Sequence, residues 1–309
     1  MTQEQSNWWR IALELKLRQS NGDAFQDFFS TLMGHLHGNS YVRVRPFGKL
    51  GDKGCDGYLL PSGQVFQCYG ALNGSGGKVS NLIKKIGVDF SKAKKAIPKI
   101  MKEWHMVHNL VDGLPIEAIE KLEQLKIKNP SIKFGFIGFE GFESRVFQLD
   151  HSVIERLLGV VATSHDSQNI HAEEIRNLVQ SIAAVADATP FDVTTIRPVP
   201  PDKLDLNKLP SHWRALIAGG WQNSNLISEY FDRHHDPLLG VRIAKAFRDR
   251  YLYLKAQGLN PGNIMSSLYE MVVPNQGALP AKQVAAQALL AYLFESCEIF
   301  EGISQKGAA

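Results

Sequence analysis

The sequence predicts an α/β protein, in which a mixed sheet flanked by helices is followed by a mostly α-helical C-terminal domain. Three observations support this fold class. Between residues 7 and 137, short alternating runs typical of strands are interspersed with longer segments of helical periodicity. A proline-rich stretch then interrupts the pattern, and only helical periodicity recurs after it.

The first half contains the elements of a sheet covered by helices. Amphipathic helices are expected at 7–19 and 22–34, because apolar residues recur there on one face. A strand with clean alternation is expected at 41–45, and a hairpin with strands at 58–60 and 64–69. The elements expected next are a lysine-rich helix within 78–102, a strand at 106–109, a helix at 115–126 and a strand at 132–137.

The prolines of residues 187–201 predict an extended linker, because proline fixes its own backbone and restricts the residue before it. We therefore expect two domains, residues 1–186 and residues 187–309. In the second domain, helices are predicted at 213–218, 225–233, 239–257, 262–273 and 280–300. The last of these is apolar and aromatic, so it either completes the domain's own core or presents a groove to a partner.

The hairpin carries the residues that point most directly to chemistry. Asp56 opens its first strand, and on the second strand Gln67 shares one face with Val65 and Tyr69. A carboxylate and an amide oxygen would then meet at one end of the ribbon, as a site for Mg²⁺ or Mn²⁺ requires. Such an ion lets a bound water attack a phosphodiester. The alternative is a glycine-rich hairpin in which Asp52 and Asp56 only cap turns.

This pattern resembles the PD-(D/E)XK, or restriction-endonuclease-like, family, in which a strand Asp is followed across a hairpin by an acid or Gln, one residue, and Lys. The matching positions are Asp56, Gln67 and Tyr69, so Tyr69 stands where the family usually has its catalytic lysine. The resemblance implies a restriction-endonuclease-like sheet with Asp56 and Gln67 as metal ligands. Gln26, on the second predicted helix, occupies the place of a Glu that adds a metal contact in related nucleases.

The missing lysine has three candidate replacements, which we rank Lys85, then Lys84, then Lys53. Lys85-Ile86 followed by Asp89-Phe90 resembles a pattern from a PD-(D/E)XK subgroup with Tyr at the hairpin position. A lysine there would stabilise developing negative charge and orient the attacking water. The alternative is that all three lysines only contact nucleic-acid phosphate.

Positive charge is concentrated beside this hairpin although the whole chain carries only +3. Eight lysines fall between residues 78 and 102, where the only acid is Asp89. Such a face would neutralise backbone phosphates and bind nucleic acid without reading its sequence. The candidates for this role are Lys53, Lys92, Lys95 and Lys99. An ordinary solvated face is the alternative.

Composition excludes several other classes of protein. With 44% hydrophobic and 21% charged residues, nothing signals disorder, and no apolar run approaches a membrane span. The N-terminal residues lack an export signal, and three cysteines without CxxC spacing suit a reducing compartment, so we expect a cytoplasmic protein. The chain contains neither a Walker A motif nor GxSxG.

Over about its whole length the chain resembles the nuclease effector of ABC-three-component, Lamassu-type antiphage systems of bacteria. The likeness is carried by the hairpin residues and by the following segments: Trp104–Asn109, Asp112–Pro115, Lys203–Leu209 and Tyr292–Glu301. It implies that the C-terminal domain joins the chain to an SMC-like ATPase and a small third subunit. It also implies that release and self-association, as a tetramer, activate DNA cleavage.

Together these observations predict a metal-dependent DNA endonuclease of low sequence specificity. The competing hypothesis is a non-catalytic DNA-binding or assembly subunit, in which Tyr69 marks the decay of a nuclease site. RNA cleavage would use the same chemistry, so the sequence leaves the choice of nucleic acid open.

Overall fold

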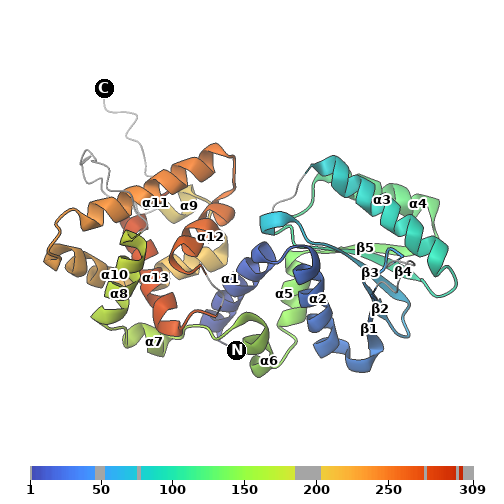
Figure 1. Cartoon of the computed structure of the whole chain (residues 1–309), viewed down its shortest axis with the longest axis horizontal. Helices are drawn as coiled ribbons and strands as arrows, with labels where there is room; N and C mark the ends of the chain where they lie inside the picture. The colour runs from blue at the N-terminus through green and yellow to red at the C-terminus, as the bar shows by residue number, and fades with distance from the viewer. Residues whose placement is uncertain are drawn as a thin grey trace. The chain divides into compact units, whose positions relative to one another are not determined.

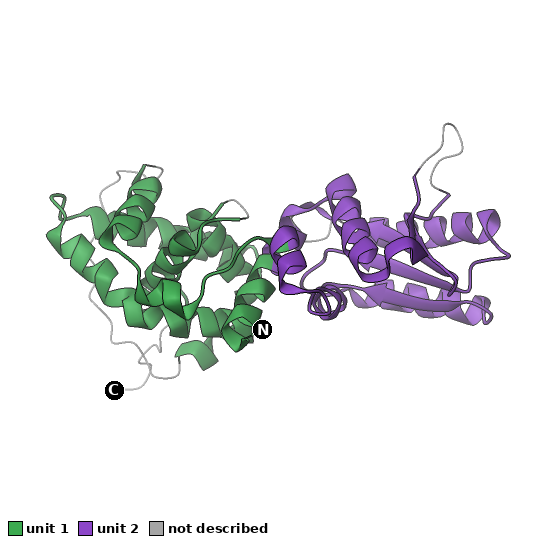
Figure 2. Ribbon diagram, turned by 90° about the horizontal axis from the view of Figure 1, so that it is seen from below, with its two compact units in different colours: residues 1–12, 158–309 green, residues 13–157 purple. Residues whose placement is uncertain are grey.

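The computed structural model describes residues 2–45, 53–74, 78–184, 203–274, 277–296 and 299–301. Two compact units are present, one formed by residues 13–157 and the other by residues 1–12 together with 158–309 (Figure 2). The boundary between them falls inside the first helix, α1 (Gln3–Gln19). The predicted linker at 187–201 lies outside the described residues.

The unit of residues 13–157 is built on one five-stranded mixed sheet with strand order β1-β2-β3-β4-β5. The first three strands are antiparallel neighbours, whereas β3, β4 and β5 run parallel. The strands are β1 (Tyr41–Arg43), β2 (Gly57–Leu59), β3 (Gln64–Tyr69), β4 (Glu103–His108) and β5 (Lys133–Ile137). The protein is therefore of the mixed α/β class, as predicted.

Helices cover both faces of this sheet (Figure 1). Helices α3 (Val79–Ala96) and α4 (Ile116–Lys128) lie on one face, and α2 (Gly22–His37) and α5 (Phe139–Val146) on the other. Under α3 and α4 the core is closed by Val65, Trp104 and Met106, all fully buried. Under α2 an aromatic cluster forms instead, where Phe29 contacts Phe66 and Phe142.

A single buried amide ties three segments of this unit together. Asn109, directly after β4, accepts a hydrogen bond from Ala71 N at 2.7 Å. Its own Nδ2 lies within bonding distance of three carbonyl oxygens, those of Leu17, Ser20 and Ala71, at 2.7–3.0 Å. Because both ends of the side chain are satisfied without water, Asn109 fixes the end of α1 against the segment that follows β3.

The other unit is helical and centres on α13 (Pro280–Glu295), whose side chains are buried on nearly all sides. The other helices of this unit are α7 (Ser164–Gln168), α8 (Ala172–Ala183), α9 (Lys203–Leu206), α10 (Ser211–Arg233), α11 (Leu239–Ala256) and α12 (Pro261–Val272). Helix α6 (His151–Leu158) belongs to the unit of residues 13–157 apart from its last residue. Among the described residues, none of the helices combines the length and apolar character that a bilayer span requires.

Two predicted helices, at 213–218 and 225–233, prove to be one continuous helix, α10. Gly219 and Gly220, between the two predicted segments, do not interrupt the helix. Their lack of a side chain lets α13 approach closely. A Cβ added to Gly220 would lie 2.4 Å from the carbonyl oxygen of Gln287, and Gln287 Nε2 donates to Leu216 O at 3.0 Å. The last helix also ends earlier than predicted, at Glu295 rather than residue 300.

The compact units also differ from the predicted domains in two respects. Residues 1–12 and helices α7 and α8, which all fall within the predicted first domain of residues 1–186, group with the C-terminal helices. The predicted boundary at 186/187 lies in the part of the chain that the structure does not describe, and it stays a prediction.

Candidate metal and nucleic-acid site

Asp56 lies at one end of the β1-β2-β3 ribbon, and the backbone fixes its position from both sides. Its amide nitrogen donates to Phe66 O at 2.8 Å, and its carbonyl oxygen accepts from Val44 N at 3.0 Å. The antiparallel register that pairs Gly57 with Phe66 places Asp56 opposite Gln67. The hairpin therefore brings the two predicted ligands together, although they are 11 residues apart along the chain.

Three donors hold the Asp56 carboxylate, which is only 6% exposed. Gln67 Nε2 and the backbone nitrogen of Cys68 both donate to Oδ2 at 2.7 Å. Gln26 Nε2, from α2, donates to Oδ1 at 3.1 Å. The three residues that the sequence places around a metal, Asp56, Gln67 and Gln26, thus form one hydrogen-bonded group.

One atom of this group is not satisfied. The Gln67 side chain is buried, at 2% exposure, and its Oε1 has no hydrogen-bond partner in the part of the chain that the structure describes. A buried carbonyl-type oxygen without a donor costs about 1–3 kcal/mol. An oxygen-seeking cation beside Asp56 would remove that cost, so this donor set fits Mg²⁺ or Mn²⁺.

The electrostatics around the carboxylate point to cations close by. Burial raises the pKa of the Cys68 thiol well above its usual value, and the charge of Asp56 raises it further. Lys85 and Arg43 act in the opposite direction on that pKa. Because Cys68 N bonds Asp56 Oδ2, both cations lie within electrostatic reach of the residue that holds the carboxylate.

Lys85 is held on α3 by Asp89, one helical turn further on. Its Nζ lies 2.6 Å from Asp89 Oδ2, and Lys92 Nζ lies 3.7 Å from Oδ1. Gly54, in the loop before Asp56, packs on the same turn, and a Cβ there would lie 2.2 Å from Asp89 O. With φ at +74°, Gly54 also adopts a backbone conformation that favours glycine. The first-ranked lysine is therefore paired with Asp89, whose backbone contacts the Asp56 loop.

Lys84 lies on a different side of α3. It lines a groove of about 600 Å³ between α3 and α4, which has an apolar floor that includes Ile83, Val88 and Leu125. Four lysines surround this floor, namely Lys84, Lys92, Lys95 and Lys121. No acid lines the groove among the residues that the structure describes, so it is a basic surface beside the sheet. Lys121 was not predicted from the sequence.

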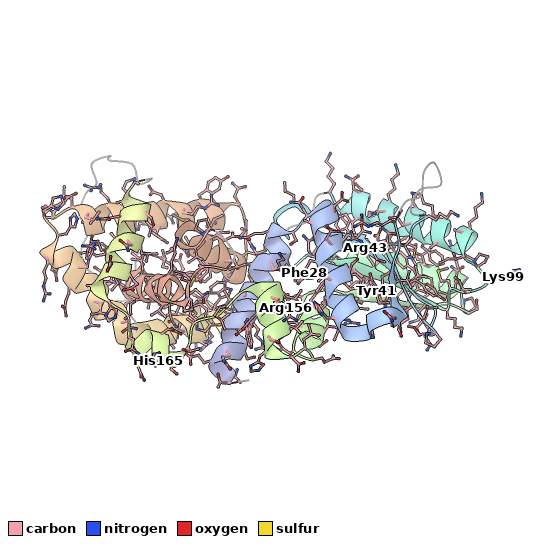
Figure 3. All side chains as sticks on the ribbon, turned by 60° about the horizontal axis from the view of Figure 1, so that its bottom comes forward. Phe28, Tyr41, Arg43, Lys99, Arg156 and His165 are labelled. Carbon is pink, nitrogen blue, oxygen red and sulfur yellow. The ribbon has the colours of Figure 1, made fainter. Side chains whose placement is uncertain are left out.

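The other predicted residues are more scattered. Lys53 is exposed in the loop before Asp56, with φ at +55°. Lys99 follows α3 near the opposite end of the hairpin, and Figure 3 shows it well apart from Arg43. Tyr69 is half-buried against the core and is paired with His108 of β4. The structure thus groups Asp56, Gln67 and Gln26, with Lys85 near them, and separates Lys84 and Lys99 from that group.

Arg43 was not predicted from the sequence as a site residue. This residue lies on β1 in register with Gly57, directly after Asp56, and its guanidinium Nη2 pairs with Asp27 beside Gln26. The only signal in the sequence was its place in an alternating strand. Among the described residues, no group of three His, Cys, Asp or Glu side chains converges as a metal cluster, so any ion here would rely on amide oxygens as well as on Asp56.

In the helical unit, the C-terminal residues are fastened to the segment that begins at Lys203. The buried Lys203 Nζ donates to the carbonyls of Phe294 and Ile299. Asn207 Nδ2 donates to Glu301 O at 2.9 Å, and Glu301 N donates back to Asn207 Oδ1 at 2.9 Å. The described residues of the motif segments at 203–209 and 292–301 are therefore joined by direct hydrogen bonds.

Comparison with known families assigns this helical part of the chain. Residues 173–301 match the family model of C-terminal domain 10 of the ABC-three-component (ABC-3C) systems. The match marks the chain as a component of an ABC-three-component antiphage system, which confirms the predicted system in this coarser form. Searches of curated proteins and of solved structures found no match to the chain.

Proposed function

We propose that the chain is a metal-dependent DNA endonuclease of low sequence specificity that acts in an ABC-three-component antiphage system. The observation that carries the proposal is the buried Gln67 Oε1, which has no donor within the described part of the chain, on a side chain that already bonds Asp56. An antiparallel ribbon continued by parallel strands is also the sheet that the restriction-endonuclease-like resemblance implies.

Asp56 and Gln67 would hold Mg²⁺ or Mn²⁺ through oxygen atoms, and Gln26 would keep the carboxylate oriented. When bound, the ion supplies a water activated for attack on a phosphodiester. Gln26 and the Cys68 amide need not move for this role, since each already bonds an Asp56 oxygen. The chain thereby presents a preorganised acid at the open end of the ribbon.

Lys85 would supply the positive charge that Tyr69 cannot. Asp89 holds its ammonium at 2.6 Å, which limits the conformations of a long side chain and directs it beside the Asp56 loop. A fixed cation at that place would stabilise the extra negative charge that the phosphate oxygens gain as the water attacks. Lys84 would instead belong with Lys92, Lys95 and Lys121 in the basic groove.

The groove would hold nucleic acid by its backbone. Lysine ammonium groups are mobile point charges that neutralise phosphate without reading base edges, which accounts for the low sequence specificity that we propose. Binding through this surface is expected to weaken steeply as salt concentration rises.

The C-terminal domain would connect the chain to its partners, an SMC-like ATPase and a small third subunit, in a Lamassu-type complex. The family match of residues 173–301 supports partner binding because ABC-three-component systems contain several components. Release from these partners and self-association, as a tetramer, would activate cleavage.

A single experiment separates the candidate functions. Purified protein, alone and with its partner subunits, is incubated with supercoiled plasmid or with tRNA, in Mg²⁺, Mn²⁺ or EDTA. A DNA endonuclease nicks and linearises plasmid only with metal and leaves tRNA intact. Degradation of tRNA but not of plasmid would show that the protein is a ribonuclease that uses the same metal-dependent chemistry. Binding of plasmid without any cleavage would identify a DNA-binding subunit with a decayed site, which the Tyr69 substitution would explain.

A further inference from the structure

We propose that Arg43 binds the scissile phosphate beside Asp56, as a second cation opposite Lys85. This inference rests on the proposed function and assigns a role to a residue that the family motif does not include. It is carried by the position of Arg43 on β1, by the state of its guanidinium and by the exposure of its partner.

Arg43 lies on the strand beside Asp56. Arg43 pairs in register with Gly57, and the next residue, Val44, donates its backbone N–H to Asp56 O at 3.0 Å. Strand β1 therefore runs directly alongside the acid.

The two cations approach from opposite faces of the sheet. Lys85 belongs to α3, whereas Asp27, the partner of Arg43, belongs to α2 on the other face. A phosphodiester has two non-bridging oxygens, and one cation on each side of the acid would neutralise both. A guanidinium is suited to this role because its planar fork of N–H donors matches a phosphate.

The guanidinium is not fully satisfied as it stands. Its Nη2 pairs with Asp27, but its Nε is buried and has no hydrogen-bond partner among the residues that the structure describes. Free N–H donors cost energy when they are removed from water, so the observed arrangement favours a conformational change that gives Nε an acceptor. A phosphate oxygen near Asp56 would be such an acceptor.

The bond that Arg43 would have to exchange is a weak one. The Asp27 side chain is 56% exposed and the Arg43 side chain 30% exposed. Exposed pairs of this kind contribute about 0–1 kcal/mol, whereas hydrogen bonds between charged groups in a less hydrated site are stronger. Asp27 therefore retains Arg43 beside the site without preventing its transfer to a phosphate.

Binding without cleavage provides the test. The affinity of a labelled DNA duplex is measured with Ca²⁺ in place of Mg²⁺, at one fixed salt concentration, for wild type, Arg43→Ala and Asp27→Asn. We expect Arg43→Ala to weaken binding roughly tenfold, and Asp27→Asn to bind as tightly as wild type or more tightly. The matched control is Lys133→Ala, which removes a cation of another exposed pair, with Glu103, at the start of β5. It should change affinity less than twofold.

A double-mutant cycle locates the contact. If Arg43 and the Asp56 metal site hold the same phosphate, the losses in affinity from Arg43→Ala and Asp56→Asn will not add. Equal binding by Arg43→Ala and wild type would overturn the inference, as would fully additive losses or an Asp27→Asn variant as weak as Arg43→Ala. Plasmid cleavage by wild type together with any of these results would leave the proposed nuclease function standing. If wild-type protein neither binds duplex nor cleaves plasmid, the inference and the proposed function both fail.

Discussion

Gln67 and Asp56 share a hydrogen bond of 2.7 Å between Nε2 and Oδ2, yet the Oε1 of the same amide is buried without a partner in the described structure. The backbones of the two residues are positioned by the antiparallel pairing of β2 with β3, which Asp56 extends by donating its N–H to Phe66 O. The proposed metal site depends on this relationship.

Replacing Gln67 by Glu should make the protein's stability depend on divalent metal. Two carboxylates would face each other at this distance, which raises the pKa of one of them. An acid whose folded pKa is raised lowers stability as pH rises through its unfolded value, so without metal we expect a loss of about 1–3 kcal/mol at pH 7. Mg²⁺ should restore the stability of the variant, because the ion would neutralise the two carboxylates. Thermal unfolding with Mg²⁺ and with EDTA measures both effects.

The matched control for that variant is Gln64→Glu, at the other end of β3, where the side chain is half-buried. Its melting temperature should be insensitive to Mg²⁺. Metal-independent stability in Gln67→Glu as well would show that no cation binds between these positions.

Lys85 and Lys84 are neighbours in sequence and should differ in kinetics. Lys85→Ala is expected to lower the cleavage rate constant about 100-fold at saturating DNA, because it removes a fixed charge beside the acid. Lys84→Ala is expected to leave that constant unchanged and to weaken DNA affinity, with a salt dependence that is smaller by about one charge. Single-turnover cleavage and binding titrations at several salt concentrations distinguish them. The reverse ranking would show that Lys84, not Lys85, replaces the motif lysine.

The stability of the protein should decrease on mild acidification because of His108. Its side chain is 3% exposed with Nδ1 unsatisfied within the described residues, and burial lowers the pKa of this histidine to about 4. A group with a depressed folded pKa contributes its full stability above the unfolded value of about 6.5 and loses it as pH falls toward 4. The loss is on the order of 3 kcal/mol.

Urea unfolding at pH 7.5 and at pH 5 tests this, with wild type compared with His108→Leu. The variant should retain the stability that wild type loses between the two pH values. The same decrease in both proteins would assign the effect to another group.

Packing in the helical unit is tightest where α10 meets α13. Gly220→Ala places a Cβ 2.4 Å from Gln287 O, on backbone that cannot move freely, and is expected to destabilise the protein by about 1–3 kcal/mol. Gly34→Ala in α2 is the control, because a Cβ there meets nothing within 4 Å and should stabilise by about 0.4–1 kcal/mol. Denaturant titration of the two variants tests this difference, and equal effects would contradict the packing account.

The sequence was informative where local patterns decide structure. Alternation and turn residues located β2 and β3, so the meeting of Asp56 with Gln67 was predictable from the hairpin alone. Gln26 was harder to place, because it reaches Asp56 from a different element, and only its position within the motif pointed to it. The antiphage system was recognised from motif residues such as Lys203 and Asn207, whose contacts join segments 91 and 94 residues apart in the sequence.

The features that could not be predicted depend on contacts between residues far apart in the sequence. Nothing near Gly219 and Gly220 indicates that Gln287 will pack against them, so α10 was wrongly predicted as two helices. Lys84 and Lys85 could not be separated without knowing that Asp89 faces the Asp56 loop and that α4 covers the other side of α3. Arg43 is not part of any sequence motif. Its proposed role follows only from the register of β1 with β2 and from its ion pair with Asp27.

Cleavage by the Asp56→Asn variant tests the central claim most directly. Asparagine keeps the shape of the side chain, and the Gln26 amide can turn to accept its new N–H, so the fold should survive. Wild type and variant are compared on supercoiled plasmid with Mg²⁺, with circular dichroism to verify folding. We expect the folded variant to cleave at least about 100-fold more slowly than wild type. Cleavage by folded Asp56→Asn at the wild-type rate would contradict the assignment of this residue to the metal site.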